Sequence, residues 1–269
     1  GGIGRSSGAR VNAALQALIL GVVQGLTEFL PVSSSGHLVL VQSWFGADFA
    51  FSEQPILFDL VLHLGTLVPV VVFYRQGLLD LARGAVQAGG GKERRFVLCV
   101  VVATLPTAVM GLTLRDTFEG MFHNPRAVAL AFLVTAGLLL LTRIARPHRA
   151  LSLGIALAIG VAQGCAITPG ISRSGATIAT GLLLGLGREE AARFSFLLSI
   201  PAILGAMVLT AKDGVRISGD HSVALLVGFF VAAGVGYLAL ALLVRLVRGG
   251  RFHWFALYLI PLALFALFR

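Results

Sequence analysis

The sequence contains one long stretch twice: ALILGVVQGLTEFLPVSSSG at residues 17–36 recurs as ALAIGVAQGCAITPGISRSG at 156–175. Nine of the twenty aligned positions are identical. Each copy runs from apolar and small residues into a break of glycine, serine and proline, PVSSSG at 31–36 and PGISRSG at 169–175. Such breaks interrupt helices. The two copies therefore predict two structural repeats, at about residues 11–74 and 151–211.

The composition around both copies is that of a membrane protein. Hydrophobic residues make up 57% of the chain and charged residues 12%, and the mean hydropathy is +0.91. A soluble domain has about 25% charged residues. These values exclude a soluble enzyme, a disordered chain and a nucleic-acid-binding protein, in spite of the net charge of +9. We expect an all-α integral membrane protein, a polytopic helical bundle.

Apolar stretches follow one another along the whole chain. Two of them are too short to cross a bilayer, which needs about 17–25 residues, and each of these two follows one of the breaks. Polar backbone at membrane depth is tolerated only inside protein or beside water, so we expect two re-entrant helical hairpins with polar tips. The stretches lie at about 11–30, 38–46, 56–74, 96–114, 127–142, 151–168, 177–186, 194–211, 223–244 and 253–268.

The distribution of Lys and Arg predicts the orientation of the chain. Basic residues mark cytoplasmic segments, here 75–95, 143–149 and 245–251, whereas 47–55, 112–126 and 212–221 carry few and are expected outside. Counting crossings from these segments makes the first hairpin enter from outside and the second from the cytoplasm. A repeat with opposite orientations is typical of an inverted-topology fold, whose sites lie near the midplane.

The N-terminal residues and the two cysteines say little about fold or function. Residues 1–10 do not begin with methionine, and we set them apart as a tail of partly artificial origin, which leaves residues 11–269 as a single membrane domain. Cys99 and Cys165 both lie in apolar runs. We expect them to be small packing residues that form no disulfide.

Ionisable residues within apolar segments are costly and usually functional. Those in this chain are Glu28, His37, Asp59, His63 and Arg173. If the two hairpins meet, Glu28, His37 and Arg173 converge with the serines of the breaks on one pocket. Asp59 and His63 share a helix face, and we expect them to support that site from behind or to brace the repeat interface.

Arg173 and the serines suggest a phosphate site. A helix beginning near Gly175 would present its N–H groups, and the Arg173 fork suits phosphate oxygens. Two plainer interpretations stay open: Arg173 neutralises Glu28, and the serines only cap helices. The residues expected to bind substrate are Gln24, Ser33, Ser35, Gly36, Ser172, Ser174, Gly175 and Thr177.

Glu28 has two candidate roles in such a site. It shares a helix face with Gln24, four residues earlier, and is the one candidate metal ligand. It is also a candidate acid or base together with His37.

The motifs QGLTEFLPVSSSGH (24–37) and PGISRSGAT (169–177), in this order, resemble those of the undecaprenyl-diphosphate phosphatase family, also called the bacitracin-resistance family. The resemblance covers about residues 11–268. It implies an inverted repeat with two re-entrant hairpins, and a catalytic set of Glu28, Ser34, His37 and Arg173, with Ser34 as candidate nucleophile. Many members have glutamate where this chain has Gln24, so a metal held by two carboxylates is not expected here.

The resemblance also implies an activity. Family members hydrolyse undecaprenyl diphosphate to undecaprenyl phosphate and phosphate, which recycles the lipid carrier of cell-wall synthesis and confers bacitracin resistance. They use a divalent cation, Mg²⁺ or Ca²⁺, and lie in the bacterial plasma membrane with the site facing the periplasm. The partners implied are the polyprenyl diphosphate and membrane lipids, with no nucleic acid and a homodimer left open. The alternative is a secondary transporter or flippase of a phosphorylated polyprenyl lipid, because inverted repeats with broken helices are typical of transporters.

Overall fold

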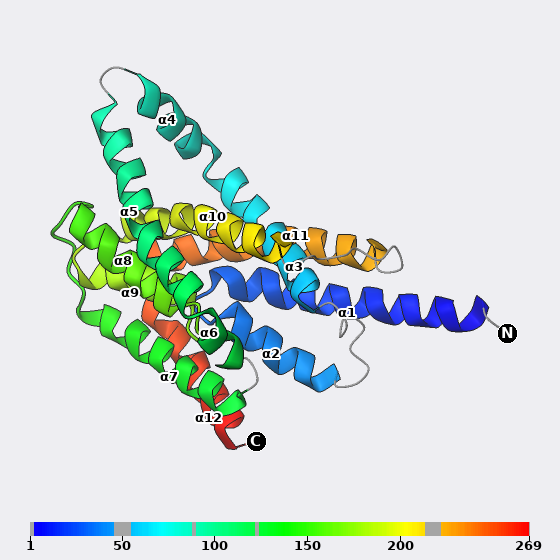
Figure 1. Ribbon diagram of the computed structural model, residues 1–269. Helices are drawn as coiled ribbons and strands as arrows, with labels where there is room; N and C mark the ends of the chain where they lie inside the picture. The colour runs from blue at the N-terminus through cyan, green and yellow to red at the C-terminus, as the bar shows by residue number, and fades with distance from the viewer. Residues whose placement is uncertain (1–2, 46–54, 88–89, 122–123, 213–221, 269) are drawn as a thin grey trace.

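A computed structural model describes residues 3–45, 55–87, 90–121, 124–212 and 222–268 (Figure 1). Within these ranges the regular structure is helical and contains no strand. The helices are α1 (Ile3–Phe29), α2 (Ser34–Phe45), α3 (Pro55–Phe73), α4 (Arg75–Val86), α5 (Gly91–Thr113), α6 (Arg115–Met121), α7 (Pro125–Leu141), α8 (Leu153–Cys165), α9 (Arg173–Leu183), α10 (Arg188–Lys212), α11 (Ser222–Arg248) and α12 (Ala256–Phe268), with short 3₁₀ turns η2 (Thr142–Ile144) and η4 (Phe252–Phe255).

Four helices among the described residues are long and apolar enough to cross a membrane: Gly91–Thr113, Arg126–Ile144, Arg188–Leu209 and Ser222–Arg248. A fifth span is formed if α3 and α4, bent by 74° at their junction, are counted as one. The expectation of an all-helical, multi-pass membrane protein is confirmed.

Several segments differ from their predictions. The basic segment 75–95 and the stretch 112–126 contain two helices that the apolar pattern does not mark, α4 and α6, because that pattern finds only apolar helices. α1 begins at Ile3, so most of the tail set apart at 1–10 is helical. Residues 47–54 and 213–221 of the two other predicted external loops lie outside the described residues.

The two cysteines also differ from each other. Both are free, as expected, but only Cys99 is buried. Cys165 is the last residue of α8 and is exposed. The prediction that Cys165 packs in the core is wrong.

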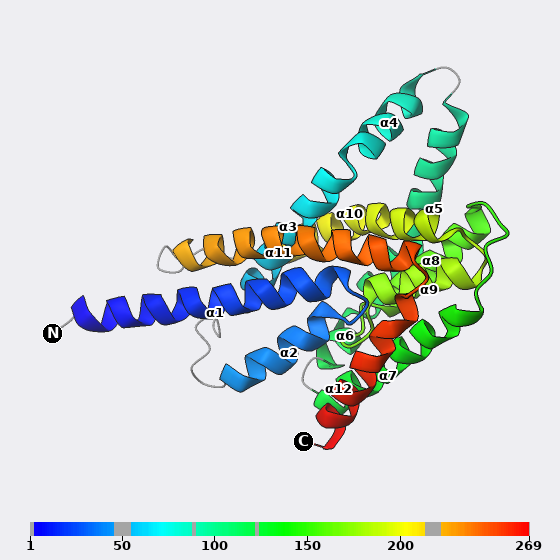
Figure 2. The same ribbon diagram turned by 180° about the vertical axis from the view of Figure 1, so that it is seen from behind.

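Two long helix pairs frame the molecule. α1 lies along α11, and α8 lies along α5 (Figures 1 and 2). Glycines allow both close approaches: a Cβ at Gly21 would lie 2.9 Å from the main-chain oxygen of Gly228, and a Cβ at Gly160 would overlap the main-chain oxygen of Ala103. Small residues that let helix backbones touch are a common basis of helix packing in membranes.

Two short helices begin beside these pairs: α2 contacts α1 and α7, and α9 contacts α7, α8 and α10. α9 is buried on almost every side, and α7 contacts both α2 and α9 while packing along α12. A broad core surrounds α9 and is lined by large side chains including Phe132, Ile178 and Phe194. The first residues of α2 and α9 therefore lie deep in the bundle, where their neighbours can hold them rigidly.

Candidate active site

The two Gly/Ser/Pro breaks meet in space. The Gly170 N–H donates to Ser33 Oγ at 3.1 Å, across 137 residues of sequence. The Ser174 hydroxyl donates to the main-chain oxygen of Leu30 at 3.3 Å. The expected convergence of the two breaks is thus confirmed, and it brings the starts of α2 and α9 together.

Serines cap both helices at this junction. Ser33 Oγ accepts from the Gly36 N–H at 3.4 Å, and Ser172 Oγ accepts from the Gly175 N–H at 3.0 Å. Ser33 adopts a φ of 68°, a left-handed conformation that non-glycine residues rarely take. These hydrogen bonds support the interpretation that Ser33 and Ser172 cap the two helices. The role of both serines in substrate binding stays a prediction.

A threonine of α7 fastens the second break. Thr135 Oγ1 donates to the Gly170 oxygen at 3.1 Å and accepts from the Ser172 N–H at 3.1 Å. Gly170 has a φ of 95°, which glycine adopts without steric cost. These contacts fix the backbone that leads into Arg173.

The Glu28 carboxylate is the centre of a polar cluster. Its side chain is only 5% exposed, and its Oε1 pairs with the Arg173 guanidinium. Its Oε2 accepts from the Ser34 hydroxyl at 2.6 Å and from Gln24 Nε2 at 3.1 Å. His63 Nε2 lies 3.6 Å from the same Oε2. Buried charges persist when they are paired and hydrogen-bonded in this way.

Ser34 and Arg173 occupy equivalent positions in the two repeats. Each is the first residue of its helix, α2 and α9 respectively. A helix N-terminus offers main-chain N–H groups and a partial positive charge to an anion. The Arg173 side chain is 20% exposed, so it can be reached by a ligand while it contacts Glu28. The cluster thus combines an anion-binding guanidinium, a hydroxyl and a carboxylate in hydrogen-bond contact with that hydroxyl.

His37 is buried and its described contacts lie away from Glu28. Its Nδ1 lies 2.7 Å from the Ser33 oxygen, and its Nε2 lies 2.8 Å from the Tyr258 hydroxyl of α12. The ring packs edge-on against Phe132. Because a carbonyl oxygen can only accept, Nδ1 carries a proton and donates it to the Ser33 oxygen. The structure therefore ties His37 to the first break and to α12, and its catalytic role stays a prediction.

The other residues predicted to bind substrate are closely packed. A Cβ at Gly36 would lie 2.6 Å from the Phe132 ring, and one at Gly175 would lie 2.9 Å from Ser172 Cβ. Thr177 Oγ1 donates to the Arg173 oxygen at 2.7 Å, and Ser35 Oγ lies 3.3 Å from Ser33 Oγ. These contacts hold the two helix starts in place.

The side chains of the cluster do not by themselves provide enough ligands to hold a metal ion. Glu28 supplies a carboxylate there, and Arg173, Ser34 and Gln24 engage both of its oxygens. No group of three or more His, Cys, Asp or Glu side chains occurs within the residues described. Gln24 Oε1 is buried without a hydrogen-bond partner, which leaves one neutral oxygen beside the carboxylate. Mg²⁺ in such sites relies on substrate phosphates for further ligands.

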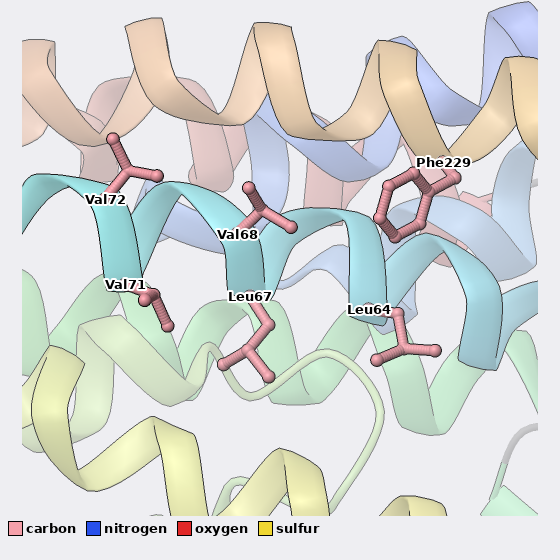
Figure 3. A pocket seen from close by; sticks show the side chains of 6 residues that line it. All are labelled: Leu64, Leu67, Val68, Val71, Val72 and Phe229. Atoms are coloured by element: carbon pink, nitrogen blue, oxygen red, sulfur yellow. The ribbon is translucent and has the colours of Figure 1, made fainter.

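An apolar groove of about 260 Å³ lies on the outer side of α3 (Figure 3). Its first lining residue directly follows His63 of the cluster in the sequence. Leu64, the residue after His63, stands at one end of the groove and Val72 at the other. At 1.5 Å per residue the two are ~12 Å apart along the helix. The groove is lined by Leu64, Leu67, Val68, Val71, Val72 and Phe229 of α11.

Three contacts were not predicted from the sequence. Tyr258 lies in an apolar stretch, and its hydroxyl was a usable signal, since a buried tyrosine usually finds a partner. Thr135 sits in a similarly apolar stretch. His63 was expected only to support the site or to brace the repeats, yet it contacts Glu28 directly.

Known proteins resemble this chain over nearly its whole length. Residues 17–265 match the family model described as bacitracin resistance protein BacA. The chain is 46% identical over 261 residues to the undecaprenyl-diphosphatase of Desulfosudis oleivorans, covering 91% of this chain and 94% of the relative. It is 44% identical over 253 residues to that of Carboxydothermus hydrogenoformans, with 91% and 93% covered, and 45% identical over 264 residues to that of Rubrobacter xylanophilus, with 93% and 95% covered.

Proposed function

This chain belongs to the bacitracin resistance protein BacA family, and from that premise we propose that the cluster around Glu28 is its active site. The chain is an undecaprenyl-diphosphatase, a membrane-embedded enzyme that dephosphorylates undecaprenyl diphosphate. The transporter alternative is not favoured. The observation that carries the site proposal is the 2.6 Å hydrogen bond from the Ser34 hydroxyl to Glu28, beside the Arg173 guanidinium.

The terminal phosphates bind where α2 and α9 begin. Arg173 supplies a planar fork of N–H donors, and the helix starts supply main-chain N–H groups. Phosphoryl transfer depends mainly on such positioning and charge stabilisation. Since Arg173 is held by Glu28 in the structure, the diphosphate competes with that carboxylate for the guanidinium.

This competition prepares the nucleophile. When the diphosphate takes Arg173, Glu28 Oε1 loses its partner while Oε2 keeps the Ser34 hydrogen bond. Ser34 Oγ then bonds to the terminal phosphorus, and its proton passes to Glu28. The bond from that phosphorus to the bridging oxygen breaks, and undecaprenyl phosphate leaves. Water hydrolyses the phosphoserine and releases phosphate. In the alternative, water attacks the phosphorus directly, with Glu28 and His37 as its bases.

A divalent cation, Mg²⁺ or Ca²⁺, belongs to the same proposal. Because the protein side chains alone do not make a metal site, the phosphates of the substrate would supply most of the ligands of the cation, and Glu28 and the Gln24 oxygen would be the protein groups that hold it. Bound there, it would neutralise phosphate charge.

The membrane arrangement is proposed from the packing symmetry. Gly21 and Gly160 are equivalent positions of the two sequence copies, and each permits a backbone contact with a helix next to the other copy, α11 and α5. Two interlocked repeats of inverted topology account for this exchange, with α1–α2 and α8–α9 as re-entrant hairpins. A bacterial plasma-membrane location with the site open to the periplasm completes the proposal; a homodimer stays a prediction.

The polyprenyl chain lies along apolar helix faces, and the groove on α3 is one such face. The lining of the groove begins at Leu64, one residue after His63, and we place the start of the polyprenyl chain there.

The experiment that tests the function is phosphate release from undecaprenyl diphosphate by the purified protein in detergent, with and without Mg²⁺. Cation-dependent release that Arg173→Ala abolishes supports both the activity and the site. Release that persists in a folded Arg173→Ala variant would move the site elsewhere. No release from the intact folded protein would contradict the function, and lipid movement across vesicles would then be measured.

A further inference from the structure

We propose that Tyr258 of α12 is a further positioning residue of the active site. Through His37 it holds the backbone turn from which the Ser34 hydroxyl reaches its carboxylate. This inference rests on the proposed function. It starts from one contact, the Tyr258 hydroxyl at 2.8 Å from His37 Nε2, which joins α12 to α2 across 221 residues of sequence.

The Tyr258 hydroxyl is turned into the protein from an apolar helix. In the sequence of α12, ALYLIPLALFALF, Tyr258 carries the one polar side-chain atom. The residue is half exposed, whereas the His37 side chain that its hydroxyl contacts is buried. A hydroxyl in apolar surroundings costs free energy unless it has a partner. Because phenylalanine would suit the apolar surface equally well, the contact with His37 accounts for a tyrosine at this position.

Three neighbours hold the His37 ring. Its Nδ1 donates to the Ser33 oxygen at 2.7 Å, and the Tyr258 ring stacks on it with the centroids 5.8 Å apart and the planes at 13°. Phe132 of α7 packs edge-on with its centroid at 5.4 Å. A tyrosine hydroxyl can both donate and accept, so its hydrogen bond to Nε2 forms in either protonation state of the imidazole. The anchoring of the ring therefore does not depend on its charge.

The Ser33 oxygen belongs to the peptide unit that joins Ser33 to Ser34. It accepts from His37 Nδ1 and, at 3.2 Å, from the His37 main-chain N–H. Because a peptide unit is planar, two hydrogen bonds to its oxygen fix the direction in which the chain enters Ser34. Ser33 needs this support, since its φ of 68° is costly for a residue other than glycine. The contacts that begin at Tyr258 thus end one residue before the hydroxyl that donates to Glu28.

Two substitutions and their combination test the inference. Tyr258→Phe removes only the hydroxyl, and His37→Phe keeps a ring beside Phe132 but removes both nitrogens. We expect Tyr258→Phe to lower kcat for undecaprenyl diphosphate about tenfold, the effect of one lost hydrogen bond. KM should be unchanged, because Arg173 and the start of its helix are untouched. In the His37→Phe background the same change should have no further effect, since the link is already broken.

A second tyrosine of the bundle provides the matched control. Tyr237 lies partly exposed on the apolar helix α11, and its described contact is a ring contact with Phe73. Tyr237→Phe should leave kcat and KM unchanged. Binding of a farnesyl methylenediphosphonate, which cannot be hydrolysed, adds a readout that general damage to the fold would alter. We expect equal binding by the wild type and Tyr258→Phe.

Three results would overturn the inference. The first is wild-type kcat in a folded Tyr258→Phe variant. The second is an equal loss of kcat from Tyr258→Phe with and without the His37→Phe change. The third is a loss of probe binding and thermal stability that accompanies the loss of kcat, which would mark a structural role. A wild-type protein that neither binds the probe nor releases phosphate contradicts the proposed function instead.

Discussion

The Ser34 hydroxyl donates to Glu28 Oε2 at 2.6 Å, although six residues and a helix break separate the two in sequence. Glu28 lies in the last turn of α1 and Ser34 begins α2. The hydrogen bond therefore spans the break and depends on the backbone turn at Ser33, whose φ is 68°. A hydroxyl held by a buried carboxylate is poised to lose its proton to that carboxylate.

Replacing this hydroxyl tests the nucleophile. Ser34→Ala should lower kcat by at least a thousandfold, because the serine pathway loses its attacking oxygen. Rapid quenching of the wild type with substrate labelled in its terminal, β-phosphate should trap a phosphoserine. Ser152→Ala, which removes a serine cap at the start of α8 outside the cluster, should leave kcat unchanged. Substantial turnover by Ser34→Ala would instead support direct attack by water.

The Glu28–Arg173 pair should couple strongly in stability. Arg173→Gln leaves a nearly buried carboxylate without its guanidinium, and Glu28→Gln leaves the opposite charge. Removing one partner of a buried pair costs about 3–5 kcal/mol. We expect the double variant to be more stable than Arg173→Gln, as measured by thermal unfolding in detergent. Simple additivity of the two single losses would show that the charges do not interact.

Substitutions of Ser33 test its unusual backbone conformation. Ser33→Ala and Ser33→Gly both remove the oxygen that accepts from Gly36 and Gly170. Only glycine tolerates a φ of 68° without cost. The alanine variant should therefore be less stable than the glycine variant by about 1 kcal/mol in thermal unfolding. Equal stability of the two variants would contradict the left-handed turn.

Substitutions of two glycines of α8, one at the contact with α5 and one away from it, test that helix contact. A Cβ at Gly160 would overlap the Ala103 backbone, whereas one at Gly154 would meet nothing within 4 Å. Gly160→Ala should destabilise the protein by at least about 1–3 kcal/mol through overpacking. Gly154→Ala should be neutral or stabilising by up to about 1 kcal/mol, because alanine favours helix. The midpoint of thermal unfolding measures both, and equal effects would argue against the α5–α8 contact.

Filling the α3 groove tests the placement of the polyprenyl chain. Val68→Trp puts a bulky ring into the groove, and Val134→Trp puts the same ring on an equally apolar, exposed face of α7. Val68→Trp should raise KM for undecaprenyl diphosphate several-fold while hydrolysis of isopentenyl diphosphate is unchanged. The Val134 variant should match wild type with both substrates. If both variants behave alike, the groove holds ordinary membrane lipid.

Much of the architecture follows from the sequence. The apolar stretches predict most of the long helices to within about five residues, since a helix in lipid must present apolar side chains along its length, but α1 begins eight residues and α10 six residues before its stretch. The breaks at 31–36 and 169–175 mark the starts of α2 and α9 because proline, glycine and serine end one helix and cap the next. Local chemistry is enough for these features. α4 and α6 escape the same pattern, since neither is a long apolar run.

The partners of the polar side chains, by contrast, do not follow from the sequence alone. The sequence predicted a convergence of Glu28, Ser34, His37 and Arg173, but the contacts divide this set: Ser34 and Arg173 bind Glu28, whereas His37 binds Tyr258. The motif contains two side chains three residues apart, and only the direction in which α2 leaves the break decides which one reaches the carboxylate. His63 and Tyr258 join through helices far along the chain. Sequence determined which polar groups are buried in the membrane; the tertiary packing decided their pairing, because a buried charge takes whichever partner the folded backbone brings within a few ångströms.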